Sequence, residues 1–364
     1  MMRFTRLSVL AVLALTTACG AKSGLFLGDG AAGSGSGSTG GGAGGSGSGS
    51  AGGGAGGSGS GGLACSPGDP PVALATGLTE PNSVVVDETN VYFVAPFAGA
   101  VMKVPKAGGE VTTVAGGLTF AGGFNASIVL AIDATHLYVA ESGGGRILRL
   151  DKDGSNLTTI ASGQDHPSAI VIDDSSVYWD NFGDGTIASA PKVGGSVVVL
   201  VTGQVSSLSP LAMAASNSAL FWFGADGHLR SVAKTGGPVS VVVYRAGVRQ
   251  IAADASRVFW SDYYQDHTVK SVSFDGSDIE DLAFVADGWP LGIALDGDEL
   301  YAGFGFSDVG ADMIVKGSKS GGPVSVIVEG QRNPEALALD VDCVYWTSVD
   351  YLEVETGSVM RAPR

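Results

Sequence analysis

Histidine and cysteine are the side chains best suited to zinc binding or nucleophilic catalysis, and this chain has few of either. Zinc sites and catalytic Cys–His pairs need several such side chains at characteristic spacing. The chain has no glycine-rich phosphate loop and no nucleophile elbow. The sequence therefore predicts no metal ion and no cofactor. The scattered residues are His136, His166, His228, His267, Cys19, Cys65 and Cys343.

One acidic segment has oxygen-bearing side chains at alternate positions. Asp180-Asn-Phe-Gly-Asp-Gly185 begins in this way like a calcium-binding loop. The remaining ligand positions of such a loop are not filled by oxygen donors. We therefore expect a solvated loop between two strands.

Cys19 ends a segment typical of export. Arg3 and Arg6 precede a short apolar run over 7–15, and Thr16-Thr17-Ala18 leads to the cysteine. This arrangement resembles a bacterial lipoprotein signal, although Thr16 stands where that pattern usually has Leu. The resemblance implies removal of residues 1–18, lipidation of Cys19, and a lipid-anchored, exported protein of the bacterial outer membrane or cell surface. An ordinary cleaved signal peptide is the alternative.

Residues 19–64 read as a tether. Between 28 and 62, 20 of 35 residues are glycine, and almost no side chain could be buried to offset the entropy of ordering. About 45 such residues reach roughly 35–40 Å. With Cys19 lipidated, Cys65 and Cys343 remain as one potential disulfide in an oxidising compartment.

The rest of the chain, 65–364, is built from a repeat. A 13-residue window occurs seven times, with starts 38 to 46 residues apart. Position seven is Asp in six copies and Ser216 in the other, and position twelve is aromatic in all seven. The windows begin at Pro81, Ser127, Pro167, Pro210, Val248, Pro290 and Pro334.

Each repeat predicts four strands. The window gives two strands around the Asp turn; a third alternating segment, a Lys-x-Gly-Gly turn in four copies, and a Val- or Thr-rich strand follow. Four strands every 42 residues or so indicate an all-β, seven-bladed β-propeller of four-stranded antiparallel blades. The seventh copy lacks its fourth strand, and Val72–Gly77 is expected to supply it and close the ring.

The aromatic positions carry a family resemblance. Tyr178-Trp-Asp180, Phe259-Trp-Ser-Asp262 and Tyr345-Trp-Thr-Ser348 resemble the YWTD repeat of propellers in the low-density-lipoprotein-receptor class. That class usually has six blades, which makes six the alternative count, and presents one face to protein partners. The repeats also resemble those of streptogramin lyases and gluconolactonase-like enzymes. This second resemblance implies His or carboxylate groups around the axis, often with a divalent metal.

The residue just before each window and the second residue of the window should lie near the axis, on the face opposite the potential disulfide. Most are small or apolar, but a few are polar or aromatic and together predict an axial pocket with convergent polar groups. The candidates are Glu80, Asn82, His166, Arg249, Trp289, Asn333 and Glu335.

The charge of the chain narrows the function classes. It has 36 acidic and 20 basic residues, a net charge of −16, which argues against a basic nucleic-acid-binding surface. Acidic residues such as Asp262 and Asp266 are expected in exposed loops beside the axial pocket. We expect a monomeric, non-enzymatic binding module for a protein, carbohydrate or small molecule, whose only membrane contact is the lipid. The alternative is a metal-dependent lyase or lactonase that uses Glu80, His166 and Glu335.

Overall fold

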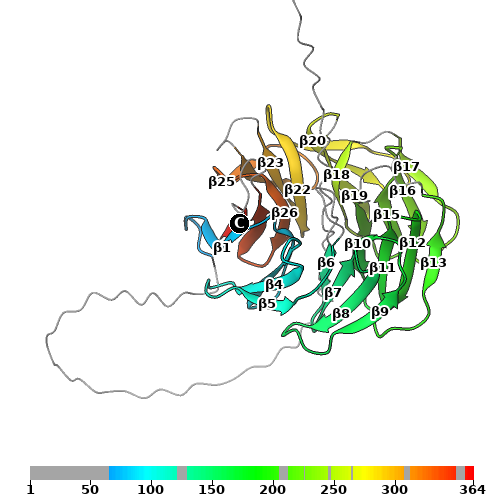
Figure 1. Cartoon of the computed structure of the whole chain (residues 1–364). Coiled ribbons are helices and arrows are strands. Elements are labelled where there is room, and N and C mark those ends of the chain that lie inside the picture. The colour runs from blue at the N-terminus through cyan, green and yellow to red at the C-terminus, as the bar shows by residue number, and fades with distance from the viewer. Residues whose placement is uncertain are drawn as a thin grey trace, which may run out of the picture.

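Seven four-stranded antiparallel sheets follow one another around a ring in the computed structural model of the chain (Figure 1). The structure describes residues 65–120, 129–204, 212–224, 226–244, 247–263, 265–306, 312–349 and 357–364. All regular elements in these ranges are strands, and no helix there could cross a membrane. The seven-bladed propeller predicted from the repeat is confirmed, and the six-bladed alternative is wrong.

Each blade runs from an innermost strand at the axis to an outermost strand at the rim. Blades 1 to 3 consist of β2 (Asn82–Val86), β3 (Asn90–Ala95), β4 (Ala100–Pro105) and β5 (Thr112–Ala115); β6 (Val129–Ile132), β7 (His136–Glu141), β8 (Arg146–Asp151) and β9 (Thr158–Ser162); β10 (Pro167–Ile172), β11 (Ser176–Asn181), β12 (Thr186–Pro191) and β13 (Val198–Val201). Blades 4 and 5 consist of β14 (Met213–Ala215), β15 (Ala219–Phe223), β16 (Leu229–Ala233) and β17 (Ser240–Val243); β18 (Val248–Ala253), β19 (Arg257–Asp262), β20 (Thr268–Ser273) and β21 (Glu280–Phe284). Blades 6 and 7 consist of β22 (Trp289–Asp296), β23 (Glu299–Gly305), β24 (Met313–Ser318) and β25 (Ser325–Glu329); β26 (Pro334–Leu339), β27 (Cys343–Ser348), β28 (Gly357–Pro363) and β1 (Val72–Leu78).

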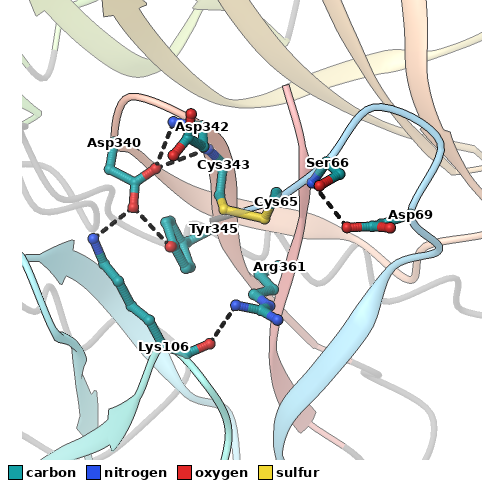
Figure 2. The surroundings of a disulfide bond; sticks show 9 residues. All are labelled: Cys65, Ser66, Asp69, Lys106, Asp340, Asp342, Cys343, Tyr345 and Arg361. Carbon is teal, nitrogen blue, oxygen red and sulfur yellow. Dashed lines mark hydrogen bonds and ion pairs between the residues drawn. A yellow bond between two sulfur atoms is a disulfide. The ribbon is translucent and has the colours of Figure 1, made fainter. Parts of the chain in front are cut away.

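Blade 7 joins the two ends of the domain. Its strand order is β26-β27-β28-β1, and Val72 of β1 lies opposite Arg361 of β28 (Figure 1). The N-terminal strand therefore supplies the missing outer strand, as predicted. Cys65, just before β1, forms a disulfide with Cys343 at the start of β27, with the two Cα atoms 5.5 Å apart (Figure 2).

The paired aromatics of the repeat are explained by the alternation of side chains along a strand. Tyr178 of β11 packs against blade 4, and the next residue, Trp179, packs against blade 2. The same alternation holds for Tyr345 and Trp346 in blade 7, which face blades 1 and 6. The core is thus divided into seven layers, one between each pair of neighbouring blades.

The residue after the aromatic pair has a structural role. In five blades the innermost strand has a register irregularity near its start, for example between Pro167 and Ile170. The backbone N–H of Ala169 within that bulge donates to Asp180, which also accepts a 2.6 Å bond from the Ser168 hydroxyl. Asp180 is fully buried, so its assignment to a solvated loop is wrong, whereas Gly183 and Asp184 of the same segment are exposed as expected. Ser261 and Thr347 accept the equivalent N–H in blades 5 and 7.

Each Asp turn is held by a cation from the next blade. Asp133 accepts hydrogen bonds from Tyr138 of its own blade at 2.8 Å and from Lys192 of blade 3 at 3.0 Å. Six of the seven junctions contain an ion pair between an Asp turn and a cation of the next blade, and we call these ion pairs the clasps. They are Asp87–Lys152, Asp133–Lys192, Asp173–Lys234, Asp254–Lys319, Asp296–Arg364 and Asp340–Lys106. In four of them a Tyr of the same blade also donates to the Asp.

The junction between blades 4 and 5 replaces the clasp with apolar contact. Ser216 stands where the other blades have Asp, and Phe274 stands where the partner blade has Lys or Arg. The ring of Phe274 lies 4.7 Å from that of Phe221, which itself replaces the usual Tyr. Ser216, Phe221 and Phe274 thus replace the Asp, the Tyr and the Lys found at other junctions, and an aromatic contact takes the place of the ion pair.

Candidate functional site

The propeller has two faces with different chemistry. The turn face carries the Asp turns, the Lys turns and the disulfide. Its charges are largely committed to the clasps, as at Lys106 and Asp340 (Figure 2). The entry face is where the innermost strands begin, at residues such as Val248, Trp289 and Pro334. The predicted axial residues lie on this second face.

Arg249 and Glu335 meet in the interior of the entry face. They occupy the same position of the repeat in blades 5 and 7, 86 residues apart in the chain. Arg249 Nη2 lies 2.5 Å from both carboxylate oxygens of Glu335, and Nε lies 3.2 Å from Oε2. Their side chains are 5 % and 6 % exposed. A bidentate pair of this kind is strong and directional. It joins blades 5 and 7, which are not neighbours in the ring.

An aromatic group covers this ion pair. The guanidinium carbon of Arg249 lies 5.1 Å from the centre of the Tyr263 ring. Trp289 lies 6.4 Å from Tyr263 and 6.2 Å from the His267 ring, which meets it edge-on. Tyr263, His267 and Trp289 are all partly exposed. We call Arg249, Glu335, Tyr263, His267 and Trp289 the aromatic site.

Sequence reasoning selected Arg249, Trp289 and Glu335 but missed Tyr263 and His267. The available signal was their position: both lie in the connection between β19 and β20, which the topology places on the entry face. His267 also has a left-handed backbone, with φ of 53°. A rule that included second-to-third-strand connections would have found them.

Two other predicted residues have mainly structural contacts. Asn333 has a φ of 37°, its backbone N–H donates a 2.8 Å hydrogen bond to the buried Asp312 carboxylate, and its side-chain amide donates to Val349 O. Asn82 begins β2, and its Oδ1 atom is buried without a hydrogen-bond partner.

Glu80 and His166 precede innermost strands and also have left-handed backbones, with φ of 47° and 54°. His166 is exposed and its Nδ1 lies 2.7 Å from Asp165 Oδ1. Burial raises the pKa of the Glu80 carboxyl. Histidine tolerates this backbone region better than glutamate does, so Glu80 is the more unusual of the two.

The acidic residues expected in exposed loops divide into two groups. Asp262 ends β19 and is only 2 % exposed, so its assignment to a solvated loop is wrong. Burial, followed by the proximity of Asp266, raises the pKa of its carboxyl, although the Gln265 N–H donates to it. Asp266 is exposed and pairs with Lys270 at 2.8 Å.

No group of three or more metal-ligating side chains occurs among the residues that the structure describes. A hollow of about 190 Å³ lies between blades 5 and 6, lined by β20, β21 and the turn before β25, away from the predicted axial residues. The signal peptide predicted over 1–18, the lipidation predicted at Cys19 and the tether predicted over 19–64 fall outside the described residues.

The comparisons with known proteins identify the fold. No protein-family model matches the chain, and no curated protein matches it. It is similar to the solved structure of YCF48 bound to D1 peptide, at 11 % identity and a TM-score of 0.60 over 83 % of this chain and all of that one. It is also similar to the computationally designed Ika8 protein, at 16 % identity and 0.54 over 79 % and 98 % of the two chains. A likeness to the nidogen/laminin complex, at 19 % identity and 0.46, spans 59 % and 86 %. At these identities the likenesses to YCF48 and Ika8 support the propeller fold alone.

Proposed function

We propose that this protein is a binding module of the bacterial cell envelope, anchored by a lipid on Cys19 and a flexible tether, which captures its partner on the entry face. The observation that carries the proposal is the aromatic site. Tryptophan, tyrosine and arginine are the residue types that dominate binding energy in protein interfaces. Here all three are in contact, and the two aromatic side chains remain partly exposed.

The organisation of the two faces supports the same role. On the turn face, the Asp and Lys side chains of the clasps satisfy one another across the blade junctions. Binding residues are most effective when a rigid scaffold holds them. The buried Arg249–Glu335 pair supplies that rigidity directly beneath the aromatic rings. The YCF48 propeller, solved with a bound peptide, illustrates that the fold is compatible with such a role.

A binding role accounts for these contacts better than the lyase or lactonase alternative. That alternative needs Glu80, His166 and Glu335 to act on one substrate. Glu335 is engaged by Arg249 on the axis, whereas His166 is exposed and paired with Asp165. We therefore propose no catalytic step for these residues.

The test compares partner capture by three forms of the purified protein in extracts of the bacterial envelope. Capture should be retained by the wild type and by Tyr244→Ala, an aromatic deletion on the rim at a residue that is 72 % exposed. It should be lost in the double variant Tyr263→Ala/Trp289→Ala. Equal capture by all three forms would contradict the proposal that the partner binds on the entry face.

The anchor requires its own measurement. Cys19→Ser should abolish metabolic labelling by a radioactive fatty acid and move the protein from the membrane fraction to the soluble fraction. Unchanged labelling would contradict lipidation at Cys19 without bearing on the aromatic site.

A further inference from the structure

Each ring of the aromatic site has an acidic residue beside it in the chain. Asp262 directly precedes Tyr263, Asp266 directly precedes His267, and Asp287 lies two residues before Trp289. These three acids come from two separate connections, at the ends of β19 and β21. Two of the three, Asp266 and Asp287, are exposed, so the connections that carry the partly exposed rings also carry exposed carboxylates.

The cations nearby are already engaged. Arg249 is held by Glu335 at 2.5 Å. Lys270 lies 2.8 Å from Asp266 and 2.5 Å from Asp281, so one ammonium serves two carboxylates. Asp287 is exposed, with φ of 62°, and it has no ion pair in the described part of the chain. Counting His267 as neutral, the carboxylates of the aromatic site and its surroundings outnumber the cations.

The charge of the whole domain has the same sign. The chain's 36 acids and 20 bases include Asp29, Arg3, Arg6 and Lys22 before residue 63, which leaves 35 acids and 17 bases in the propeller, a net charge of −18. Such a field attracts cationic partners and increases their association rate. The aromatic rings add a second attraction, since a cation over the face of Trp or Tyr is stabilised by the ring's electron density.

We infer that the aromatic site binds a cationic side chain, lysine or arginine, of a protein or peptide partner, with the cation against Trp289 and the carboxylates of Asp287 and Asp266 around it. This inference rests on the proposed function and specifies its ligand class. Arg249 already lies over the Tyr263 ring, whereas no cation of the described residues lies over the partly exposed Trp289.

Trp289 provides a built-in reporter. The chain has five tryptophans, and the other four are at most 1 % exposed. They are Trp179, Trp222, Trp260 and Trp346. Quenching of tryptophan fluorescence by ions in solution therefore reports the environment of Trp289 almost alone.

The first experiment compares caesium and iodide as quenchers of the intact protein. Negative potential around Trp289 should make caesium the better quencher after correction for the intrinsic efficiencies of the two ions. Asp266→Asn/Asp287→Asn should reduce the difference, whereas Asp174→Asn/Asp298→Asn, with the same loss of charge at exposed positions of the turn face, should not. More efficient quenching by iodide would overturn the inference.

The second experiment titrates the protein with a tetra-arginine peptide, using tetra-serine and tetra-glutamate peptides and maltoheptaose as alternatives. Tetra-arginine should give a saturable change in fluorescence that weakens as salt is added. Its affinity should fall about tenfold in Asp266→Asn/Asp287→Asn and stay unchanged in the turn-face variant. Calorimetry should show a similar loss in Trp289→Ala.

The other outcomes are equally decisive. A response to tetra-glutamate or maltoheptaose but not to tetra-arginine would overturn the ligand class while leaving the entry face as a binding surface. Equal weakening by the turn-face variant would reduce the effect to non-specific attraction and overturn the site. Absence of any response up to millimolar peptide would also overturn it. Failure of the proposed function is distinct, because it would be seen as envelope capture that does not depend on Tyr263 and Trp289.

Discussion

The clasps predict a graded loss of stability when their lysines are replaced by methionine. Methionine keeps much of the apolar stem and removes the charge. The four lysines to compare differ in burial and in distance to the Asp carboxylate. Lys106 is 3 % exposed and 2.5 Å from Asp340, whereas Lys152 is 21 % exposed and 3.5 Å from Asp87.

The size of the loss in stability depends on how buried the Asp carboxylate is once its cation has been removed. Lys106→Met leaves the Asp340 carboxylate partly buried with its Tyr345 and backbone donors but no cation, and breaking a buried pair in this way costs about 3–5 kcal/mol. Lys152→Met removes a long, more solvated pair, for which the expected cost is about 0–1 kcal/mol. Lys192 and Lys234 both lie 3.0 Å from their Asp, at 13 % and 12 % exposure, and should cost about 1.5–3 kcal/mol each.

The assay is urea unfolding with the disulfide intact, followed by circular dichroism. A double-mutant cycle of Lys106→Met with Asp340→Asn separates the pair from the other contacts of each residue. The expected order of destabilisation is Lys106, then Lys192 and Lys234 together, then Lys152. Equal costs at the four sites, or the largest cost at Lys152, would refute the assignment of the clasps as partly buried structural pairs.

Three further predictions concern the blade junctions and the closure of blade 7. Burial opposes ionisation of Asp173, but bonds from Lys234, Ser175 N–H and Tyr178 hold its pKa at about 2, below the ordinary 3.8, so its contribution to stability is present above pH 4 and is lost as the pH falls towards 2. Urea midpoints between pH 2 and 5 should therefore fall on the acid side, and a flat profile would contradict this. Cys65→Ser/Cys343→Ser opens a loop of 278 residues and should lower the free energy of unfolding by about 5 kcal/mol at most, as measured by the same urea unfolding curves. An unchanged urea midpoint would show that the disulfide does not stabilise the closed ring. Phe274→Lys should destabilise the junction between blades 4 and 5 because no carboxylate is present there, and adding Ser216→Asp should restore part of the loss; strictly additive effects would contradict the exchange of clasp for aromatic contact.

The structure explains why the repeat could be recognised so readily. The Asp turn, the aromatic pair and the glycine turn all make their contacts within one blade or with the blade next to it. In five of the six Asp turns, the side chain accepts a hydrogen bond from the N–H two residues later, as it does between Asp87 and Thr89. Such requirements are local, so they recur at fixed spacing and are visible in the sequence.

The errors arose where a residue's partner lies across a strand or a blade. Asp180 and Asp262 follow the aromatic pair and resemble loop acids in the sequence, but β11 and β19 extend far enough to bury them. The bulge N–H that Asp180 satisfies belongs to another strand, 11 residues earlier in the chain. A pattern of residue types along one strand carries no information about such an unpaired donor.

The sequence by itself determined the number of blades, the closure of the last blade by the N-terminal strand, the aspartates of six turns and the lysines of four turns. It could do so because strand period and turn chemistry are properties of short segments. Only the tertiary structure decided which lysine meets which aspartate, and that Arg249 reaches Glu335 beneath the Tyr263 and Trp289 rings. Those contacts join different blades, and their geometry exists only once the ring has closed and set each sheet against the next.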